Sequence, residues 1–118
     1  MTPSPVHHAL ADARLDSFHV ETVQKVADAI RAHDIVVVGM AWNPNCPRGV
    51  RALEGAGHEV EYMEFGSYAS AWRERLALKL WAKWPTFPMV FVKGQLIGGA
   101  DQAEAAVKSG ELERLLKA

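Results

Sequence analysis

The run Ile35-Val36-Val37-Val38 constrains the fold of this chain more than any other feature. These β-branched residues show no alternation with polar ones, which is typical of a strand covered on both faces. The preceding segment, Phe18 to Ala32, places apolar residues at the i, i+3, i+4 and i+7 spacing of an amphipathic helix. A helix followed by a doubly covered strand predicts an α/β fold with this strand at the centre of the sheet.

The next residues continue the α/β order. Gly39 to Gly49 is rich in Gly, Pro and Asn and predicts a loop before a second helix that fades at Gly55 and Gly57. Glu59 to Phe65 predicts a second strand, which the right-handed crossover rule makes parallel to the first. The loop after the first strand is the kind of junction where α/β folds place their chemistry.

The second half of the chain predicts a third helix and then a hairpin. Ala69 to Lys83 is expected to be helical with Trp72, Leu76 and Leu80 on its apolar face, and the prolines of segment 84–88 end it. Met89 to Val92 and Leu96 to Gly98 are expected to pair, because the Lys93-Gly94 step between them suits a tight turn.

Asp101 and Glu104 have the spacing of a capping box, so a fourth helix is expected to start at Asp101. Glu111 to Lys117 adds a last short helical piece. Together the elements predict one domain over residues 18–118, a three-layer α/β/α sandwich around a four-stranded mixed sheet. Residues 1–17 show little apolar periodicity and are expected to form a flexible N-terminal arm.

Charge and hydropathy exclude several classes of function. A formal net charge of -1 gives no basic field for phosphate backbones, so nucleic-acid binding is not expected. The apolar stretches are much shorter than the ~20 residues that span a bilayer, so no membrane segment is expected. The first residues lack a basic and an apolar targeting region, which favours a cytoplasmic location.

Cys46 is the only cysteine, so an internal disulfide is impossible. Its thiol is therefore buried and inert, reactive, or half of an intermolecular link. Its place near the start of the second helix leaves these alternatives open.

Two motifs in the second half carry a family resemblance. Trp84-Pro85-Thr86-Phe87-Pro88 and Gly98-Gly99-Ala100-Asp101 stand in the order and at the separation found in glutaredoxins, and Gly110-Glu111-Leu112 follows near the C-terminus. In the monothiol branch the first two segments read W-P-T-x-P and G-G-C-D. From about residue 20 to the end, the chain resembles this branch of the thioredoxin fold.

The resemblance implies a glutathione site. It implies a cis Phe87-Pro88 bond, with the Phe87 backbone on the cysteinyl part of glutathione. It places Ala100 and Asp101 around the γ-glutamyl end, where a helix N-terminus attracts a carboxylate. Lys79 matches a basic position used against the glycine carboxylate, although a surface lysine on a helix needs no such role. The predicted glutathione-binding residues are Lys79, Thr86, Phe87, Pro88, Gly99, Ala100 and Asp101.

The same motifs have a purely structural interpretation. Gly98 and Gly99 are compatible with any strand-to-helix turn, and Trp84 is compatible with an aromatic position in the hydrophobic core. Family members also carry a strand-end lysine, where this chain has Met40 and Ala41. The cysteine of G-G-C-D is Ala100 here, so the implied glutathione site loses one anchor.

The active-site loop departs from the family pattern. Family members read Cys-Pro-Tyr-Cys or Cys-Gly-Phe-Ser, whereas this chain reads Trp42-Asn43-Pro44-Asn45-Cys46. An alignment without gaps puts Asn43 at the nucleophile and Pro47 on the fourth helical position, where one hydrogen bond is lost. The other register makes Cys46 the N-cap and Pro47 the first helical residue, which exposes the thiol to the helix dipole.

Three functions follow from these alternatives. Cys46 can be the catalytic thiolate of a glutathione-dependent thiol-disulfide oxidoreductase in redox homeostasis. Alternatively, Cys46 and glutathione ligate a [2Fe-2S] cluster in an iron-sulfur carrier of the monothiol type. In the third case, the chain is a non-catalytic module that binds glutathione or a protein partner. The chain is expected to be a monomer or a cluster-bridged homodimer, with glutathione as its expected ligand.

Overall fold

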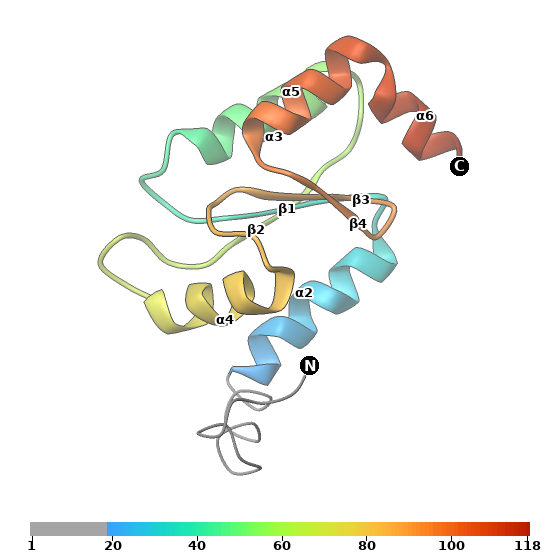
Figure 1. Cartoon of the computed structure of the whole chain (residues 1–118). Coiled ribbons are helices and arrows are strands. Elements are labelled where there is room, and N and C mark those ends of the chain that lie inside the picture. The colour runs from blue at the N-terminus through green and yellow to red at the C-terminus, as the bar shows by residue number, and fades with distance from the viewer. Residues whose placement is uncertain (1–18) are drawn as a thin grey trace, which may run out of the picture.

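A computed structural model describes residues 19–118 and contains a four-stranded mixed sheet. The strand order is β2-β1-β3-β4, with β1 parallel to β2 and antiparallel to β3, and β3 antiparallel to β4 (Figure 1). The strands are β1 Ile35–Gly39, β2 Glu61–Glu64, β3 Met89–Val92 and β4 Gln95–Gly98. The predicted central strand and its parallel neighbour are confirmed.

Helices cover both faces of this sheet. Figure 1 shows α3 and α5 on one face and α2 and α4 on the other. The helices are α2 Val20–Ala32, α3 Asn45–Gly55, α4 Trp72–Ala82, α5 Ala100–Ser109 and α6 Glu111–Lys117. The predicted three-layer arrangement is therefore confirmed.

Strand β1 is buried along its whole length. Val36 and Val38 pack with Val26 of α2 and Leu78 of α4, while the alternate residues pack toward α3 and α5. Full burial of one valine side chain stabilises a fold by ~1.5 to 3 kcal/mol. The apolar run thus forms the centre of both cores.

Helix α4 is turned differently from the sequence-based prediction. Its predicted apolar face is exposed, with Trp72 56%, Leu76 39% and Leu80 54% accessible. Arg75 and Leu78 are buried instead. The predicted apolar face is therefore wrong.

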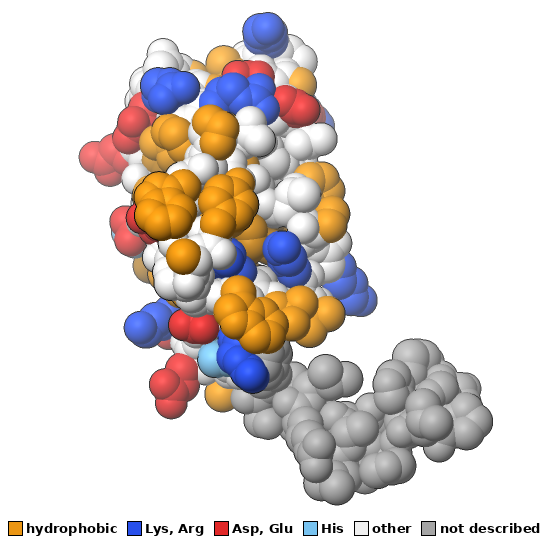
Figure 2. Space-filling model, turned by 90° about the vertical axis from the view of Figure 1, so that its left-hand side faces the viewer, with side chains coloured by type: hydrophobic (Ala, Val, Ile, Leu, Met, Phe, Trp, Pro, Cys, Tyr) orange, Lys and Arg blue, Asp and Glu red, His pale blue; other side chains and the backbone are white. Residues whose placement is uncertain are grey.

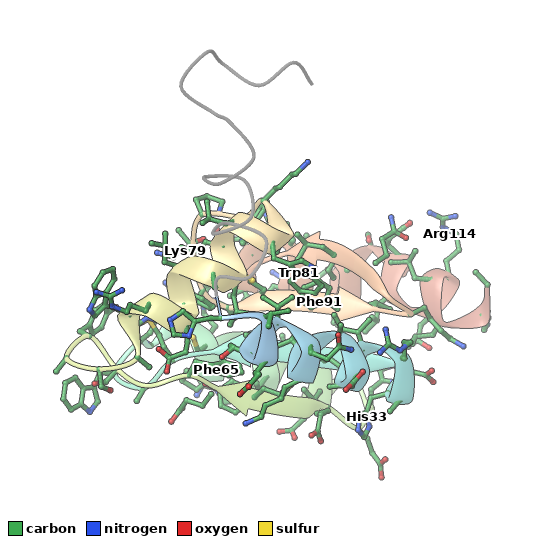
Figure 3. All side chains as sticks on the ribbon, turned by 90° about the horizontal axis from the view of Figure 1, so that it is seen from below. His33, Phe65, Lys79, Trp81, Phe91 and Arg114 are labelled. Carbon is green, nitrogen blue, oxygen red and sulfur yellow. The ribbon has the colours of Figure 1, made fainter. Side chains whose placement is uncertain are left out.

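The cause lies in the loop before α4. Arg75 Nη1 donates hydrogen bonds to the carbonyl oxygens of Phe65, at 3.0 Å, and of Ser70. A buried guanidinium requires such acceptors, and a helical periodicity cannot foresee carbonyls supplied by a loop. On the sheet side of the same helix, Trp81 packs against Phe91 of β3, with 6.0 Å between ring centroids (Figure 3).

The β3–β4 hairpin turns at Lys93-Gly94, as predicted. Both residues have positive φ, 51° and 81°, which a tight hairpin turn requires and which glycine adopts without steric cost. The prolines after α4 also have the expected effect, because the helix ends at Ala82.

None of the helices described over residues 19–118 is long and apolar enough to cross a membrane. The predicted arm over residues 1–17 lies outside the described residues. The domain boundary at residue 18 and the cytoplasmic location stay predictions.

Candidate functional site

The loop after β1 is shorter than predicted, because helix α3 already begins at Asn45. Pro47 is therefore the third helical residue. The first N–H groups of a helix have no partner within it, so proline costs no hydrogen bond at this position. Both expectations for this segment are corrected: Cys46 is not the N-cap, and Pro47 does not stand on the fourth helical position.

Asn43 joins the helix start to the segment before Pro88. Its Oδ1 accepts a hydrogen bond from the Asn45 N–H at 2.9 Å, a local turn that short amide side chains favour. Its Nδ2 donates to the Phe87 carbonyl oxygen at 3.4 Å. The Asn43 side chain therefore lies beside the Phe87 backbone.

Cys46 points away from that position, into the protein. The residue is 0% exposed, and its Sγ accepts a hydrogen bond from the Met40 N–H at 3.5 Å. A Cβ added at Gly39 would approach both Cys46 Sγ and the Tyr62 ring within 3 Å, so the sulfur lies packed between the end of β1 and β2. Burial raises the pKa of the Cys46 thiol, and the Met40 hydrogen bond offsets only part of this shift.

A groove forms on the other side of the loop, around the Phe87-Pro88 bond. This bond is cis, as the resemblance implied. We call the cavity of about 290 Å³ the Phe87 groove. It is lined by Asn45, Arg48, Trp84, Thr86, Phe87, Pro88, Gly99, Ala100, Asp101 and Gln102.

The structure brings most of the predicted glutathione-binding residues together. Six of them, Thr86, Phe87, Pro88, Gly99, Ala100 and Asp101, line the Phe87 groove. The Lys79 Nζ lies 5.7 Å from the centroid of the Phe87 ring.

The predicted loop residues are divided between two cavities. Asn45 lines the Phe87 groove, whereas Trp42, Asn43 and Pro44 line an apolar pocket on the β2 side of the loop. Cys46 lines neither of these cavities. The structure thus separates the predicted binding residues from the predicted catalytic one.

Helix α5 begins one residue earlier than the capping-box prediction. Gly99 is the N-cap, and its N–H donates to Gln102 Oε1 at 2.8 Å. Gly98, with φ 127°, has no room for a side chain, because a Cβ there would lie 2.6 Å from Gln102 Cγ. Asp101 is therefore an exposed residue of the first helical turn, and its prediction as N-cap is wrong.

Arg48 joins α3 to α5 at the edge of the groove. Its Nη2 lies 2.8 Å from Asp101 Oδ1, and its Nη1 lies 2.7 Å from Glu104 Oε1. The hydrogen bond to Asp101 is the main factor that raises the pKa of Arg48. No local pattern links residues 53 positions apart, so the sequence offered no signal for this contact.

Trp84 also lines the Phe87 groove, and sequence reasoning did not assign this residue to the site. Its Nε1 is buried and has no hydrogen-bond partner among the described residues. A Cβ added at Gly99 would lie 3.9 Å from this nitrogen. The indole N–H of Trp84 is therefore a buried donor near the start of α5.

The described residues offer a poor fit to an iron-sulfur cluster. No group of three or more His, Cys, Asp or Glu residues within 19–118 is arranged to hold a metal ion. A cluster shared through a protein thiolate needs that sulfur at the surface, whereas Cys46 Sγ is enclosed beside Met40. Asn43, whose side chain donates a hydrogen bond to the Phe87 carbonyl oxygen, offers only an amide.

Comparisons with known proteins agree on one family of relatives. The chain is 38% identical over 103 residues to a glutaredoxin-like protein of Dictyostelium discoideum, covering 87% of this chain and 84% of the relative. A probable monothiol glutaredoxin of Legionella pneumophila is 35% identical over 77 residues, covering 63% of this chain and 83% of that protein. No protein-family model matches the chain.

Solved structures support the same relationship. The crystal structure of oxidized glutaredoxin 2 from Chlamydomonas reinhardtii matches with a TM-score of 0.69 at 27% sequence identity. The match covers 83% of this chain and 92% of that structure. The backbone of both chains therefore follows the same path around the sheet.

Proposed function

Because this chain belongs to the glutaredoxin family, we propose that it binds glutathione in the Phe87 groove without exchanging thiols through Cys46. The observation that carries the proposal is the contrast between two side chains of one loop. Asn43 lies beside the Phe87 backbone, whereas Cys46 is fully buried behind it.

The groove supplies groups suited to each part of glutathione. The Phe87 backbone is placed for the cysteinyl residue, and the start of α5 offers N–H groups for the γ-glutamyl carboxylate. Lys79, above the Phe87 ring, supplies a positive charge for the glycine carboxylate.

The loop supplies no nucleophile for a disulfide bound in this groove. Thiol exchange requires a thiolate in line with the disulfide sulfur, and the Asn43 amide has no ionisable group. Burial favours the protonated thiol of Cys46 and keeps it from a bound ligand. A disulfide of glutathione would therefore bind at Asn43 and persist.

The iron-sulfur function is less well supported, because its one protein thiolate would have to come from the enclosed Cys46. We expect anaerobic reconstitution with iron, sulfide and glutathione to give a colourless protein. A brown dimer that binds one [2Fe-2S] cluster, and loses it in Cys46→Ser, would establish the carrier function instead.

Two measurements on the purified chain test the proposal. Calorimetry with S-methylglutathione, which cannot exchange, is expected to show saturable binding. Lys79→Glu should weaken this binding, because it puts a negative charge where the glycine carboxylate is proposed to lie. A glutathionylated peptide incubated with the chain and free glutathione is expected to keep its disulfide for as long as a protein-free control. Rapid reduction that Cys46→Ser abolishes would show that Cys46 is catalytic and overturn the proposal.

A further inference from the structure

The outer edge of β2 carries backbone groups that no strand satisfies. Within residues 19–118, β2 pairs with β1 alone and stands last in the sheet. An edge strand presents a row of N–H and C=O groups that can pair with an added extended segment. Two cavities of different chemistry lie at the two ends of this edge.

An apolar pocket lies at the end where β2 finishes. Its volume is about 640 Å³, within the usual range for a site that takes a large side chain or small ligand. Trp42 forms part of its wall although 72% of this side chain is exposed. Six of the residues that line the apolar pocket are Met40, Trp42, Pro44, Pro47, Val50 and Tyr62.

Figure 2 shows the face formed by the β1–α3 loop and the β2–α4 loop, where hydrophobic side chains gather. The Ala41 N–H donates to the Gly66 carbonyl at 2.7 Å, so these two loops lie side by side. Exposed aromatic residues of the loops are Trp42 and Tyr68. The apolar pocket therefore opens on a face where an apolar partner residue can be desolvated.

An acidic pocket of about 670 Å³ lies at the end where β2 begins. Its carboxylates come from three parts of the chain: Asp34 before β1, Glu54 at the end of α3, and Glu59 and Glu61 around the start of β2. His33 and His58 also line it. In Figure 3, His33 and Phe65 lie toward opposite ends of this edge of the molecule.

We propose that the β2 edge binds an extended segment of a partner protein that carries a Lys or Arg and a large apolar residue about four positions apart. The backbone of this segment pairs with β2, its basic side chain enters the acidic pocket, and its apolar side chain enters the apolar pocket. Val60 lines the acidic pocket and Glu64 lines the apolar pocket, four residues further along the chain. At ~3.3 Å per residue this is roughly 13 Å, which sets the spacing between the two side chains.

Charge decides between a partner protein and a second copy of this chain. Pairing two β2 edges would bring Glu59, Glu61 and Glu64 of one copy close to the same residues of the other, and like charges on paired strands are unfavourable. Among residues 19–118, Arg51 is the only lysine or arginine that lines either pocket. Lys93 lies 3.6 Å from Asp34, which leaves Glu54, Glu59 and Glu61 without a lysine or arginine partner in the described part of the chain. A basic segment is therefore the complementary occupant.

This site is separate from the Phe87 groove. Among residues 19–118, none lines both the groove and either pocket, and the apolar pocket lies on the other side of the active-site loop. The proposal does not rest on glutathione binding, although Asn43 both lines the apolar pocket and contacts the Phe87 carbonyl.

Pooled peptides provide the test. One pool of acetylated, amidated seven-residue peptides has fixed Lys at position 2 and Phe at position 6, with the other positions drawn from Thr and Val. A second pool has Glu in place of Lys, and a third repeats the first with alternate backbone amides N-methylated. Backbone amide NMR of residues 61–64 and the Trp42 indole signal report binding.

The Lys pool is expected to shift these signals with an apparent Kd at least tenfold lower than that of the Glu or N-methylated pool. Trp42→Ala and Glu61→Lys should each raise this Kd at least threefold. Trp72→Ala, another exposed tryptophan outside both pockets, should leave it unchanged. The proposal would be overturned if the three pools bound equally, if none of them bound, or if the shifts were confined to other residues. This holds whatever the S-methylglutathione titration shows.

Discussion

The Phe87 groove and Cys46 lie at the same end of the sheet, but different forces fix their arrangement. The groove is held by local geometry, with the Phe87-Pro88 segment on one side and the start of α5, closed by Gln102, on the other. The side chain of Cys46 is held by burial in the core beneath the loop. A ligand groove and a reactive thiol are therefore separable, because each depends on different contacts.

The largest expected effect comes from placing a thiol beside the Phe87 backbone. Asn43→Cys places a sulfur beside the Phe87 carbonyl and two residues before the first residue of α3. A thiol near a helix N-terminus has a lowered pKa, so we expect reduction of a glutathionylated peptide to rise at least ~100-fold over the parent chain. The double variant Asn43→Cys, Cys46→Ser should keep most of this activity. If the gain requires Cys46, the separation of groove and thiol is wrong.

A smaller effect concerns the contribution of Cys46 to the free energy of unfolding at alkaline pH. The folded pKa of Cys46 is raised above its unfolded value, so its contribution to stability is fully present below the unfolded pKa, ~8.5. This contribution to stability falls as the pH rises from the unfolded pKa through the folded pKa of Cys46. Urea midpoints at pH 7 and pH 10 should therefore differ more for the parent chain than for Cys46→Ala. Identical pH dependence in both proteins would mean that the thiol is not desolvated.

The secondary-structure elements were largely predictable because short patterns encode them, whereas the residues of the groove were implied by the family resemblance. The β-branched run of β1, the turn at Lys93-Gly94 and the prolines after α4 each act on neighbouring residues. The exposed face of α4 was not predictable, since the acceptors for Arg75 come from another segment. The inward position of Cys46 likewise depends on the packing of Tyr62 from β2.

The smallest expected effect lies at the groove edge. Glutathione carries a net negative charge near neutral pH, so loss of the Arg48 cation makes the groove less favourable for it. Arg48→Gln should raise the Kd for S-methylglutathione about two- to fivefold, a size typical of one partly exposed charge. Arg51→Gln, on the same helix but lining the apolar pocket, serves as the matched control. An equal change in both variants would show only a general charge effect.

Alkylation of Cys46 in the native chain tests most directly whether groove and thiol are separate. The rate with iodoacetamide is measured from pH 6 to 10, in buffer and in denaturant. Because the sulfur is enclosed beside Met40, we predict a native rate at pH 8 at least ~100-fold below that of the unfolded chain, with an apparent pKa above ~8.5. A native rate faster than the unfolded one, with an apparent pKa below ~7.5, would contradict the account and identify Cys46 as an activated thiol.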